Sequence, residues 1–379
     1  MSIEVVVIGG GIAGASAAWH LAGRCAVTVL EGEPQPGMHA TGRSAALLTE
    51  TAGPPEVCAL AAASREFLAS PPAGFADQPL LSPRGLLHVA RRGEEVLLEA
   101  KLHDATALDV EMRELDGEQC RALVPVLRTG VLVAGAFEPA AMSIDVDALL
   151  HGYLRGARTL GATVHLGVPV EQIERQEDRW RVSTRERTWD CDVVVNAAGA
   201  WCDEIAVMAG VEPLSLRPLR RSVFVFPPPP SLDISGWPMV WDVTQRFYFE
   251  PESGMILASP ADEIPSEPCD ARPAEEDIAR GVEELEIATE LEVRGVRRTW
   301  AGLRTFSPDG VPVVGFDPSA SGFFWLAGQG GYGIKTSPAM GRLTADLIAG
   351  ARPQLSLDGR GSAIDPAALA VERFAGMAS

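Results

Sequence analysis

Several features that mark particular protein classes are scarce or missing in this sequence. The six cysteines include no C-x-x-C pair, so the usual spacing of zinc ligands is missing, and we expect reduced thiols and no metal site. No apolar run approaches the roughly 18 residues that a transmembrane helix needs. No basic segment precedes the first apolar stretch, so we expect a cytoplasmic protein without a signal peptide.

The sequence also has fewer basic residues than acidic ones. The chain has 32 lysine and arginine residues against 51 acidic ones, which gives a net charge of −19. An acidic surface repels a phosphate backbone, so we do not expect a nucleic-acid partner. The 379 residues are 46% apolar, an ordinary globular composition that is long enough for about two domains.

The N-terminal segment has the pattern of a complete βαβ unit. A β-branched run over residues 3–8 predicts a buried strand, and the small residues 15–22 predict a helix. A glycine-rich turn, residues 9–14, lies between them, and residues 26–31 predict a second buried strand. This order is that of a dinucleotide-binding unit.

Each glycine of such a unit, and the acidic residue at the end of its second strand, has a physical role. Gly9 permits a tight turn, Gly11 lets the backbone approach a pyrophosphate, and Gly14 lets helix and strand pack closely. The phosphates then face a helix N-terminus, where free N–H groups favour an anion. Glu31 ends the second strand and is placed to accept hydrogen bonds from ribose hydroxyls. The alternative is a chance glycine turn.

A second glycine-rich turn near the C-terminus favours FAD over a nicotinamide cofactor. Residues 328–333 lie between a predicted strand, 323–327, and a predicted helix, 337–348. Reduced flavin carries negative charge at N1 and C2=O, which the N-terminus of a second helix stabilises. A purely structural turn is the alternative reading of this segment.

The middle of the chain predicts further strands. Residues 192–199 read as a strand followed by small residues, with a helix from Trp201, and residues 179–188 read as an antiparallel strand. Short strands of a separate sheet are expected at 223–226, 246–250 and 255–258. The prolines at 227–230 exclude a central strand there.

We therefore predict an α/β protein, α+β overall. It has a Rossmann-like FAD-binding domain and an inserted substrate domain with a mixed or antiparallel sheet. The FAD-binding domain is expected to be discontinuous, with segments 1–80, 140–217 and 300–379. The substrate domain takes 81–139 and 218–299.

With these residues identified, the sequence resembles the D-amino-acid oxidase, sarcosine oxidase and glycine oxidase superfamily of FAD enzymes. It is most similar there to the bacterial D-arginine dehydrogenase type of D-amino-acid dehydrogenase. The resemblance covers nearly the whole chain, and its motifs are residues 9–14 with Glu31, 42–46, 196–202, 220–222, 247–248, 300–304 and 329–333.

The resemblance implies two groups of site residues. Arg221, Tyr248 and Arg304 would hold the substrate carboxylate, and the carbonyl of Gly331 would face the amine. Ser44 and Ala45 would lie near flavin N5. The whole implied cofactor set is Gly9, Gly11, Ile12, Ala13, Gly14, Glu31, Gly32, Thr41, Gly42, Arg43, Ser44, Ala45, Ala46, Val170, Ala198, Gly199, Trp201, Gly330, Gly331, Tyr332, Gly333 and Ile334.

The chemistry of an amino acid suits these side chains. A guanidinium matches a carboxylate with two parallel hydrogen bonds, each worth about 1.5–3 kcal/mol. Holding that end fixes Cα–H over N5. Three alternatives stay open: Arg304 in a structural ion pair, Arg220 rather than Arg221 pointing inward, and Tyr248 as a core residue. His39, next to the motif, is expected to be structural.

The sequence departs from the D-arginine-type pattern on the substrate side. Leu47 and Ala52 stand where that type has a histidine and a tyrosine, and Leu86 stands in place of its glutamate. With Leu47, Leu48, Leu86 and Leu87 expected in the pocket, no counter-ion is evident for a basic side chain. We therefore predict a small or apolar side chain, or a cyclic amine such as proline.

Three further expectations follow from the resemblance. Covalent sarcosine oxidases attach FAD through a cysteine in the segment that matches 300–309, which has none here, so FAD should be held non-covalently. Those oxidases also use a lysine to activate oxygen, and the matching residues 254–258 contain none, which favours a dehydrogenase. The loop 49–55 is expected to act as a lid hinged at Gly53.

The predicted function is FAD-dependent oxidative deamination of a small or apolar D-amino acid. Hydride passes from Cα to N5, and the imino acid hydrolyses to a 2-oxo acid and ammonia. The D hand comes from the resemblance alone, and neither a general base nor an electron acceptor can be named. The alternatives are oxidation of secondary or cyclic amines of the sarcosine, glycine or proline type, a non-catalytic flavin subunit of a larger complex, and a nicotinamide-dependent reductase.

Overall fold

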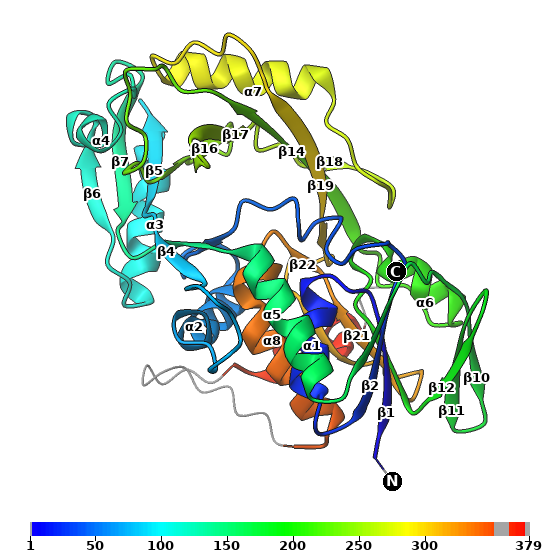
Figure 1. Ribbon diagram of the computed structural model, residues 1–379. Coiled ribbons are helices and arrows are strands. Elements are labelled where there is room, and N and C mark those ends of the chain that lie inside the picture. The colour runs from blue at the N-terminus through cyan, green and yellow to red at the C-terminus, as the bar shows by residue number, and fades with distance from the viewer. Residues whose placement is uncertain (1, 352–363, 376–379) are drawn as a thin grey trace.

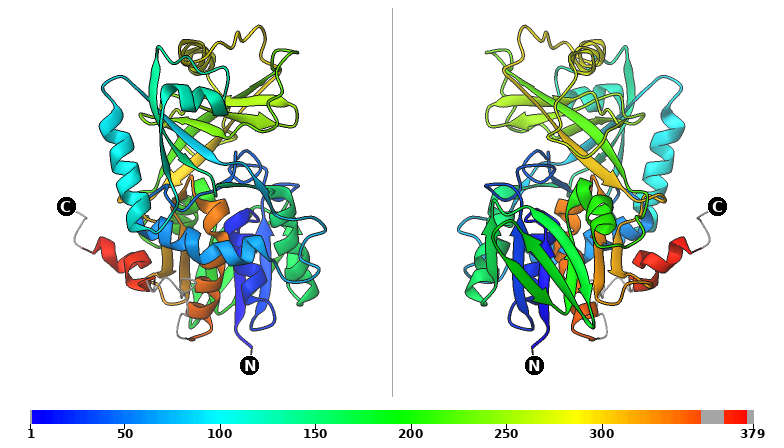
Figure 2. Two further views of the ribbon diagram at one scale, coloured as in Figure 1. Left: turned by 90° about the vertical axis from the view of Figure 1, so that its left-hand side faces the viewer. Right: turned by 90° about the vertical axis from the view of Figure 1, so that its right-hand side faces the viewer.

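The computed structural model describes residues 2–351 and 364–375. Residues 352–363 and 376–379 of the expected third FAD-binding segment lie outside the described residues. Two regions lie one above the other in Figure 1 and in both views of Figure 2: a large sheet with α7 (Glu275–Ala288) across its outer end, and a smaller sheet with its helices. The chain crosses between the two regions several times.

The smaller region is built on a six-stranded sheet of Rossmann-like type. Five of its strands are parallel, and β20 is antiparallel at one edge. The strand order is β20 (Val313–Phe316), β21 (Phe323–Ala327), β13 (Val193–Asn196), β1 (Glu4–Ile8), β2 (Ala26–Glu31) and β9 (Thr163–Leu166). The predicted strands at both chain ends and in the central piece are therefore neighbours in one sheet.

Strand β1 shows why this sheet needs cover on both faces. Val5 and Val7 pack in the cluster that contains the helices, whereas Val6 and Ile8 pack in a second cluster on the other side. All four side chains are at most 5% exposed. Side chains alternate between the faces of a strand, so a continuous apolar run such as this one requires two buried faces.

Helices cover one face of this sheet and a small antiparallel sheet covers the other. The helical side consists of α1 (Ile12–Leu21), α2 (Pro55–Ala69), α5 (Val146–Thr159) and α8 (Gly333–Ile348), with α1 between α5 and α8 (Figure 2, left). The opposite side has β10 (Val170–Gln176), β11 (Arg179–Thr184) and β12 (Thr188–Cys191), followed along the chain by η1 (Gly199–Trp201) and α6 (Cys202–Met208). The antiparallel strand predicted over 179–188 is confirmed as β11, but it ends at Thr184, and a turn separates it from β12.

The large sheet contains the strands predicted for the substrate domain. They are longer or shifted: β14 (Arg217–Phe226), β16 (Tyr248–Glu252) and β17 (Met255–Ser259). The rest of the sheet is formed by β22 (Gln329–Gly330), β19 (Arg298–Phe306), β15 (Met239–Asp242), β5 (Leu86–Arg91), β7 (Leu132–Glu138) and β6 (Arg113–Asp116), with β18 (Ile264–Pro265) beside β14. Since β19 begins at Arg298, the expected boundary at residue 300 falls inside a strand.

The remaining elements connect the two regions or cover their outer faces. They are the small sheet of β3 (Leu47–Leu48), β8 (Met142–Ile144) and β4 (Leu81–Pro83), the helices α3 (Glu95–Ala107) and α4 (Gly117–Leu123), and the short turns η2 (Pro366–Leu369) and η3 (Val371–Phe374). Among the described residues, no helix is both long and apolar enough to cross a membrane.

Candidate functional site

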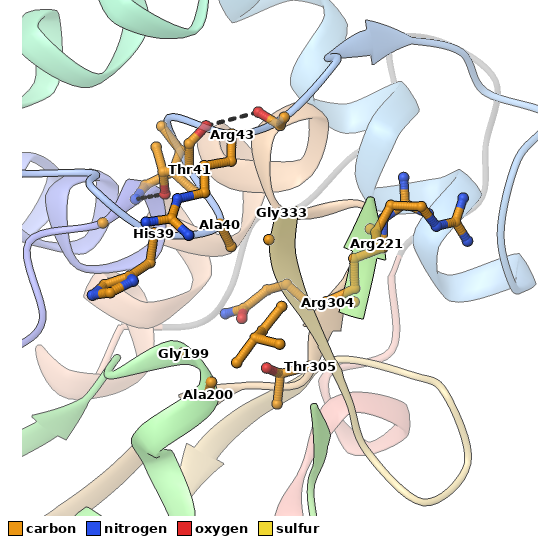
Figure 3. A pocket seen from close by; sticks show the side chains of 18 of the residues that line it. His39, Ala40, Thr41, Arg43, Gly199, Ala200, Arg221, Arg304, Thr305 and Gly333 are labelled. Atoms are coloured by element: carbon orange, nitrogen blue, oxygen red, sulfur yellow. Dashed lines mark hydrogen bonds between the residues drawn. The ribbon is translucent and has the colours of Figure 1, made fainter. Parts of the chain in front are cut away.

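A cavity of about 880 Å³ lies between the two regions and is lined by residues of both. Its walls include every site residue expected from the sequence except Gly14 and Gly42. Figure 3 shows how the labelled lining residues divide: His39, Thr41 and Arg43 lie together, and Arg221 and Arg304 lie together elsewhere on the wall. One end is thus formed by the dinucleotide motif, and another part of the wall carries cationic side chains.

The glycine turn after β1 has the geometry that its sequence predicts. Gly9 has φ +108°, and a Cβ on it would lie 2.4 Å from the carbonyl oxygen of Ala197. A Cβ on Gly14 would lie 1.9 Å from the carbonyl oxygen of Gly9. Gly14 therefore acts from outside the cavity, by letting α1 pack against the turn. The N–H groups of the first turn of α1 consequently lie at the cavity wall.

Glu31 is held at the edge of the cavity by backbone groups. Its carboxylate accepts hydrogen bonds from Gly10 N–H at 2.6 Å and from Glu33 N–H at 2.8 Å. A carboxylate has about four acceptor positions, so two stay available for ribose hydroxyls. Its place at the end of β2 agrees with the role that the sequence predicts.

The segment after Glu31 closes over the same end of the cavity. The hydroxyl of Thr41 accepts a hydrogen bond from Ile12 N–H at 3.0 Å, and Ser44 Oγ donates to the Thr41 carbonyl at 2.7 Å. His39 bonds to Glu33 at 2.9 Å, and its ring centroid lies 4.6 Å from that of Trp201. These contacts support the structural role expected for His39.

Arg43 lines the cavity, but its guanidinium is engaged with protein groups. It donates to the carbonyls of Met38, Ala271 and Ala301 at 2.9–3.0 Å and pairs with Asp270. Trp300 Nε1–H donates to the Arg43 carbonyl at 3.1 Å. Arg43 therefore joins the two regions at the cavity wall and shapes the site from there.

A second helix N-terminus reaches the cavity beyond the glycine turn at 328–333. Helix α8 begins at Gly333, and Gly330 through Ile334 line the wall. The residue before the helix, Tyr332, gives no side-chain cap, so the first N–H groups of α8 have no partner from that side chain. This is the second anion-favouring position that the sequence predicts for a flavin.

Strand register decides which of the two adjacent arginines faces the cavity. In the antiparallel pair of β14 and β19, Leu219 stands opposite Arg304 and Arg221 opposite Gly302, and all four line the cavity. Arg220 points to the other face, where its guanidinium pairs with Asp277. Because side chains alternate along a strand, Arg221 and Arg304 are diagonal neighbours on one face.

The two cavity arginines differ in their partners. Arg221 is 3% exposed, and it donates to the Asp262 carbonyl at 2.7 Å and to Glu263 at 2.8 Å. Its Nη1 is buried without a partner. The side chain of Arg304 makes no hydrogen bond or ion pair within the described part of the chain. A Cβ on Gly331 would lie 3.1 Å from Arg304 Cζ, so the glycine makes room for this guanidinium.

The electrostatics of this part of the wall favour an anion. Burial, and next the neighbouring charge of Arg304, lower the pKa of Arg221 to about 10. The nearby carboxylates of Glu263 and Asp262 act in the opposite direction, but they do not offset burial and the charge of Arg304. Arg304, which has no ionic partner, is therefore the side chain most available to receive a carboxylate.

Aromatic and apolar side chains complete the part of the wall that carries Arg221 and Arg304. Tyr248 is 2% exposed, its ring centroid lies 5.5 Å from that of Trp241, and Arg221 Cζ lies 6.0 Å from it. Met239, Trp241 and Leu47 also line the cavity. The sequence alone did not distinguish Met239 and Trp241 from core residues.

The expectation that four leucines line the pocket was wrong for three of them. Leu48 packs among the helices, Leu87 packs in the core of the large sheet, and Leu86 is buried in the cluster that also contains Tyr248. Alternation of side chains accounts for Leu48, which follows the lining residue Leu47 on β3, and for Leu87 on β5. Leu86 is excluded because it is fully buried in its cluster. His88, two residues after Leu86 on the same face, reaches the lining.

Several polar side chains of the lining were missed by the sequence reasoning, among them His88, Lys101 and Lys335. His88 is 3% exposed, and burial holds its pKa well below the ordinary value, so its ring is neutral. Lys335 is 4% exposed and belongs to the first turn of α8. The only sequence signal for Lys335 is its position directly after the glycine-rich turn.

Comparisons with known proteins agree with this geometry. The sequence profile of the family described as FAD dependent oxidoreductase, DAO, matches residues 4–347. Glycine oxidase of Bacillus licheniformis is 27% identical over 365 residues, which are 92% of this chain and 93% of that enzyme. Mitochondrial dimethylglycine dehydrogenase of Mus musculus is 26% identical over 263 residues, but the match covers only 64% of this chain and 30% of that enzyme.

The fold is also that of a solved relative. Glycine oxidase of Geobacillus kaustophilus superposes with a TM-score of 0.82, over 95% of this chain and all of that one, at 22% sequence identity. At this identity the likeness supports the fold, including the Rossmann-like domain, and leaves the substrate to be argued from the site.

Proposed function

Because this chain belongs to the DAO family of FAD-dependent oxidoreductases, we propose that it uses FAD to oxidise a small amino acid or a related carboxylated amine. The observation that carries this proposal is Arg304, a guanidinium at the cavity wall without an ionic partner in the described chain. Its position beside Arg221 makes this part of the cavity a receptor for one carboxylate. A site without an acid to bind has no use for this arrangement.

The residues of the cofactor end fit FAD. Gly9, Gly11 and the start of α1 would hold the pyrophosphate, Glu31 the ribose, and Gly330 through Ile334 the flavin. When bound, FAD supplies the acceptor, N5, for the hydride of the substrate Cα–H bond. We propose that it is held non-covalently, since residues 300–309 contain no cysteine.

The protein's own contribution is orientation. Arg304 grips the carboxylate, and Tyr248, beside Arg221, lies at the same part of the wall to hold it from a second direction. We propose that the carbonyl of Gly331, a residue that packs against the Arg304 guanidinium, accepts a hydrogen bond from the substrate amine. With the carboxylate and the amine of the substrate both held, the direction of the Cα–H bond is fixed relative to the flavin.

The lining near Arg304 supports a small or apolar side chain. Leu47, Met239 and Trp241 are apolar, and the acidic lining residues at this end, Asp242 and Glu263, are paired with Arg246 and Arg221. A lysine or arginine substrate would therefore lack a counter-ion. We propose a D-amino acid, converted to its imino acid and then by water to the 2-oxo acid and ammonia; the resemblance to D-amino-acid dehydrogenases supports the D hand.

A second candidate is the oxidation of a secondary amine such as sarcosine, or of glycine or proline. It is supported by the similarity to glycine oxidase and to dimethylglycine dehydrogenase, whose names indicate small amines of this kind. Both candidates use the same carboxylate grip. A non-catalytic flavin subunit is disfavoured because it needs no unpaired Arg304. The lack of lysine at 254–258 supports a dehydrogenase over an oxidase.

The test is anaerobic mixing of the purified holoenzyme with a matched panel of D- and L-alanine, D-leucine, D-arginine, sarcosine, glycine and L-proline, followed at the flavin absorbance. We expect bleaching by small D-amino acids and none by D-arginine. Bleaching by sarcosine, glycine or proline alone would establish the second candidate. If the yellow enzyme stays oxidised with every member, the carboxylated-amine proposal is wrong.

A further inference from the structure

Lysine is almost absent from this protein, and its two positions share one cavity. Of the 32 basic lysine and arginine residues only Lys101 and Lys335 are lysines. Both line the cavity described above. Their surroundings differ: Lys335 is deeply buried and its ammonium donates two hydrogen bonds, whereas the side chain of Lys101, on α3, makes no hydrogen bond or ion pair within the described residues.

The ammonium of Lys335 holds the backbone of a loop that forms part of the cavity wall. Lys335 Nζ donates to the carbonyls of Thr49 at 2.8 Å and Ala52 at 2.7 Å, and it lies 5.2 Å from the ring centroid of Tyr332. Thr49, Ala52 and Gly53 are themselves lining residues. We name residues 49–53 the wall loop. Two carbonyls that converge on one point suit a compact ammonium better than a planar guanidinium.

The wall loop is anchored from other directions as well. The hydroxyls of Thr49 and Thr51 donate to the same oxygen of Glu138, at 2.7 and 2.6 Å, and Glu50 forms an ion pair with Arg65. Gly53 packs so closely that a Cβ on it would lie 3.3 Å from Tyr332 Cζ and 2.7 Å from a methyl of Val57. The side chains that anchor the loop come from α8, β7 and α2, three elements far apart in sequence.

We propose that Lys335 is a positioning residue that fixes the wall loop against α8, so that the loop forms a permanent wall of the substrate end. This replaces the expectation of a lid hinged at Gly53. An unmade hydrogen bond at a buried carbonyl is costly, so opening the loop must either expose Lys335 or leave the Thr49 and Ala52 carbonyls without a donor. Because α8 also begins at the flavin end, the clamp links substrate wall and cofactor wall through one side chain.

Deprotonation does not undo this clamp. Burial lowers the pKa of Lys335 to about 8, against the opposing effects of Cys58 on α2, Glu138 on β7 and Glu50 in the loop. The ring of Tyr332 and the carbonyls of Thr49 and Ala52 complete its surroundings. A neutral amine keeps two N–H donors, and the loop offers two acceptors. The clamp therefore holds in both protonation states.

The test compares Lys335→Met with the matched variant Lys101→Met by hydrogen–deuterium exchange of the holoenzyme. The methionine has nearly the volume of lysine but no donor. We expect peptides covering residues 49–53 to exchange about tenfold faster or more in Lys335→Met, as the loss of two hydrogen bonds implies. Lys101→Met should leave these peptides unchanged, and peptides from α5 should be unchanged in both variants.

A kinetic measurement adds a second readout, and this one rests on the proposed function. With a substrate found in the panel above, Lys335→Met should raise KM about tenfold and change kcat much less, because the loop shapes the pocket and carries no reacting group. Lys335→Gln, which keeps a donor for one carbonyl, should fall between wild type and Lys335→Met in both measurements.

The outcomes separate the two proposals. Unchanged exchange of the wall loop in Lys335→Met overturns the clamp, whatever the substrate. Faster exchange with no oxidisable substrate supports the clamp and rejects the proposed function. If Lys335→Met does not fold, Lys335→Gln decides, because wild-type exchange in the wall loop of that variant contradicts the clamp.

Discussion

The two ends of the cavity are built in different ways. The cofactor end is mainly backbone: the Gly9 turn and the N-termini of α1 and α8. The substrate end is mainly side chains, with Arg221, Tyr248 and Arg304 coming from three strands. A backbone site fails when a Cβ is added, whereas a side-chain site fails when a functional group is removed. The predictions below test this difference, from the largest expected effect to the smallest.

Adding one methyl group at the cofactor end should have the largest effect. In Gly9→Ala the new Cβ would meet the Ala197 carbonyl oxygen at 2.4 Å in a backbone conformation, φ +108°, that L-residues rarely adopt. We expect loss of bound flavin and a loss of stability above about 3 kcal/mol. The measurements are the flavin absorbance of purified protein and the urea midpoint.

The control for this prediction is Gly236→Ala. A Cβ at Gly236 meets no atom within 4 Å, so this variant should bind flavin as the wild type does and change stability by less than about 0.5 kcal/mol. A yellow, stable Gly9→Ala protein would contradict the idea that backbone shape decides the cofactor end.

Removing one charged group at the substrate end should leave flavin in place and abolish efficient turnover. Arg304→Met should lower kcat/KM by about 100- to 1,000-fold, the effect of losing a bidentate charge-assisted pair. Arg298→Met is the matched control, because Arg298 is on the same strand but exposed and stacked on Trp300. Steady-state kinetics with the best substrate of the panel gives the result. Equal losses in the two variants would remove Arg304 from the substrate site.

One buried titratable group in each region should make stability depend on pH, and the two dependences should have opposite signs. Burial lowers the pKa of His20, on α1, to about 3 and raises the pKa of Glu250, on β16, to about 7. Below pH 6.5 the unfolded chain binds more protons at His20, so its contribution to stability falls as pH falls. Between pH 4.5 and 7 the folded chain binds more protons at Glu250, so stability falls there as pH rises.

Urea midpoints between pH 4 and 8 check this pair. Moving a carboxyl pKa from its ordinary 4.5 to about 7 corresponds to about 3 kcal/mol, so Glu250→Gln should gain relative stability of this order above pH 7. In His20→Leu the free energy of unfolding should instead fall less steeply as pH is lowered below 6.5. The same pH profile in both variants would show that neither group titrates as its burial implies.

Changing the contact between Trp300 and Arg43, which joins the two regions, should have the smallest effect on stability and flavin binding. Trp300→Phe removes the hydrogen bond of 3.1 Å to the Arg43 carbonyl, while the Arg43 guanidinium keeps its own partners. We expect a loss of about 1 kcal/mol in the free energy of unfolding and flavin binding within twofold of wild type. A large loss of flavin would mean that the orientation of Arg43 depends on Trp300.

The sequence by itself determined the cofactor end of the cavity, because the residues that form it are close together along the chain. The order of strand, glycine turn, helix, strand and Glu31 lies within one short segment, and each residue acts through its own backbone or a near neighbour. The turn before α8 could be predicted for the same reason. The family resemblance added Arg221, Tyr248 and Arg304, and all three line the cavity.

Only the tertiary structure decided what the substrate end contains. The register of β14 against β19 turned Arg221 inward and Arg220 outward, and alternation along β5 removed Leu87 from the wall and brought in His88. The clamp of Lys335 on residues 49–52 joins positions more than 280 residues apart. Contacts at such separations depend on how strands pair and helices pack, which no local pattern of residues specifies.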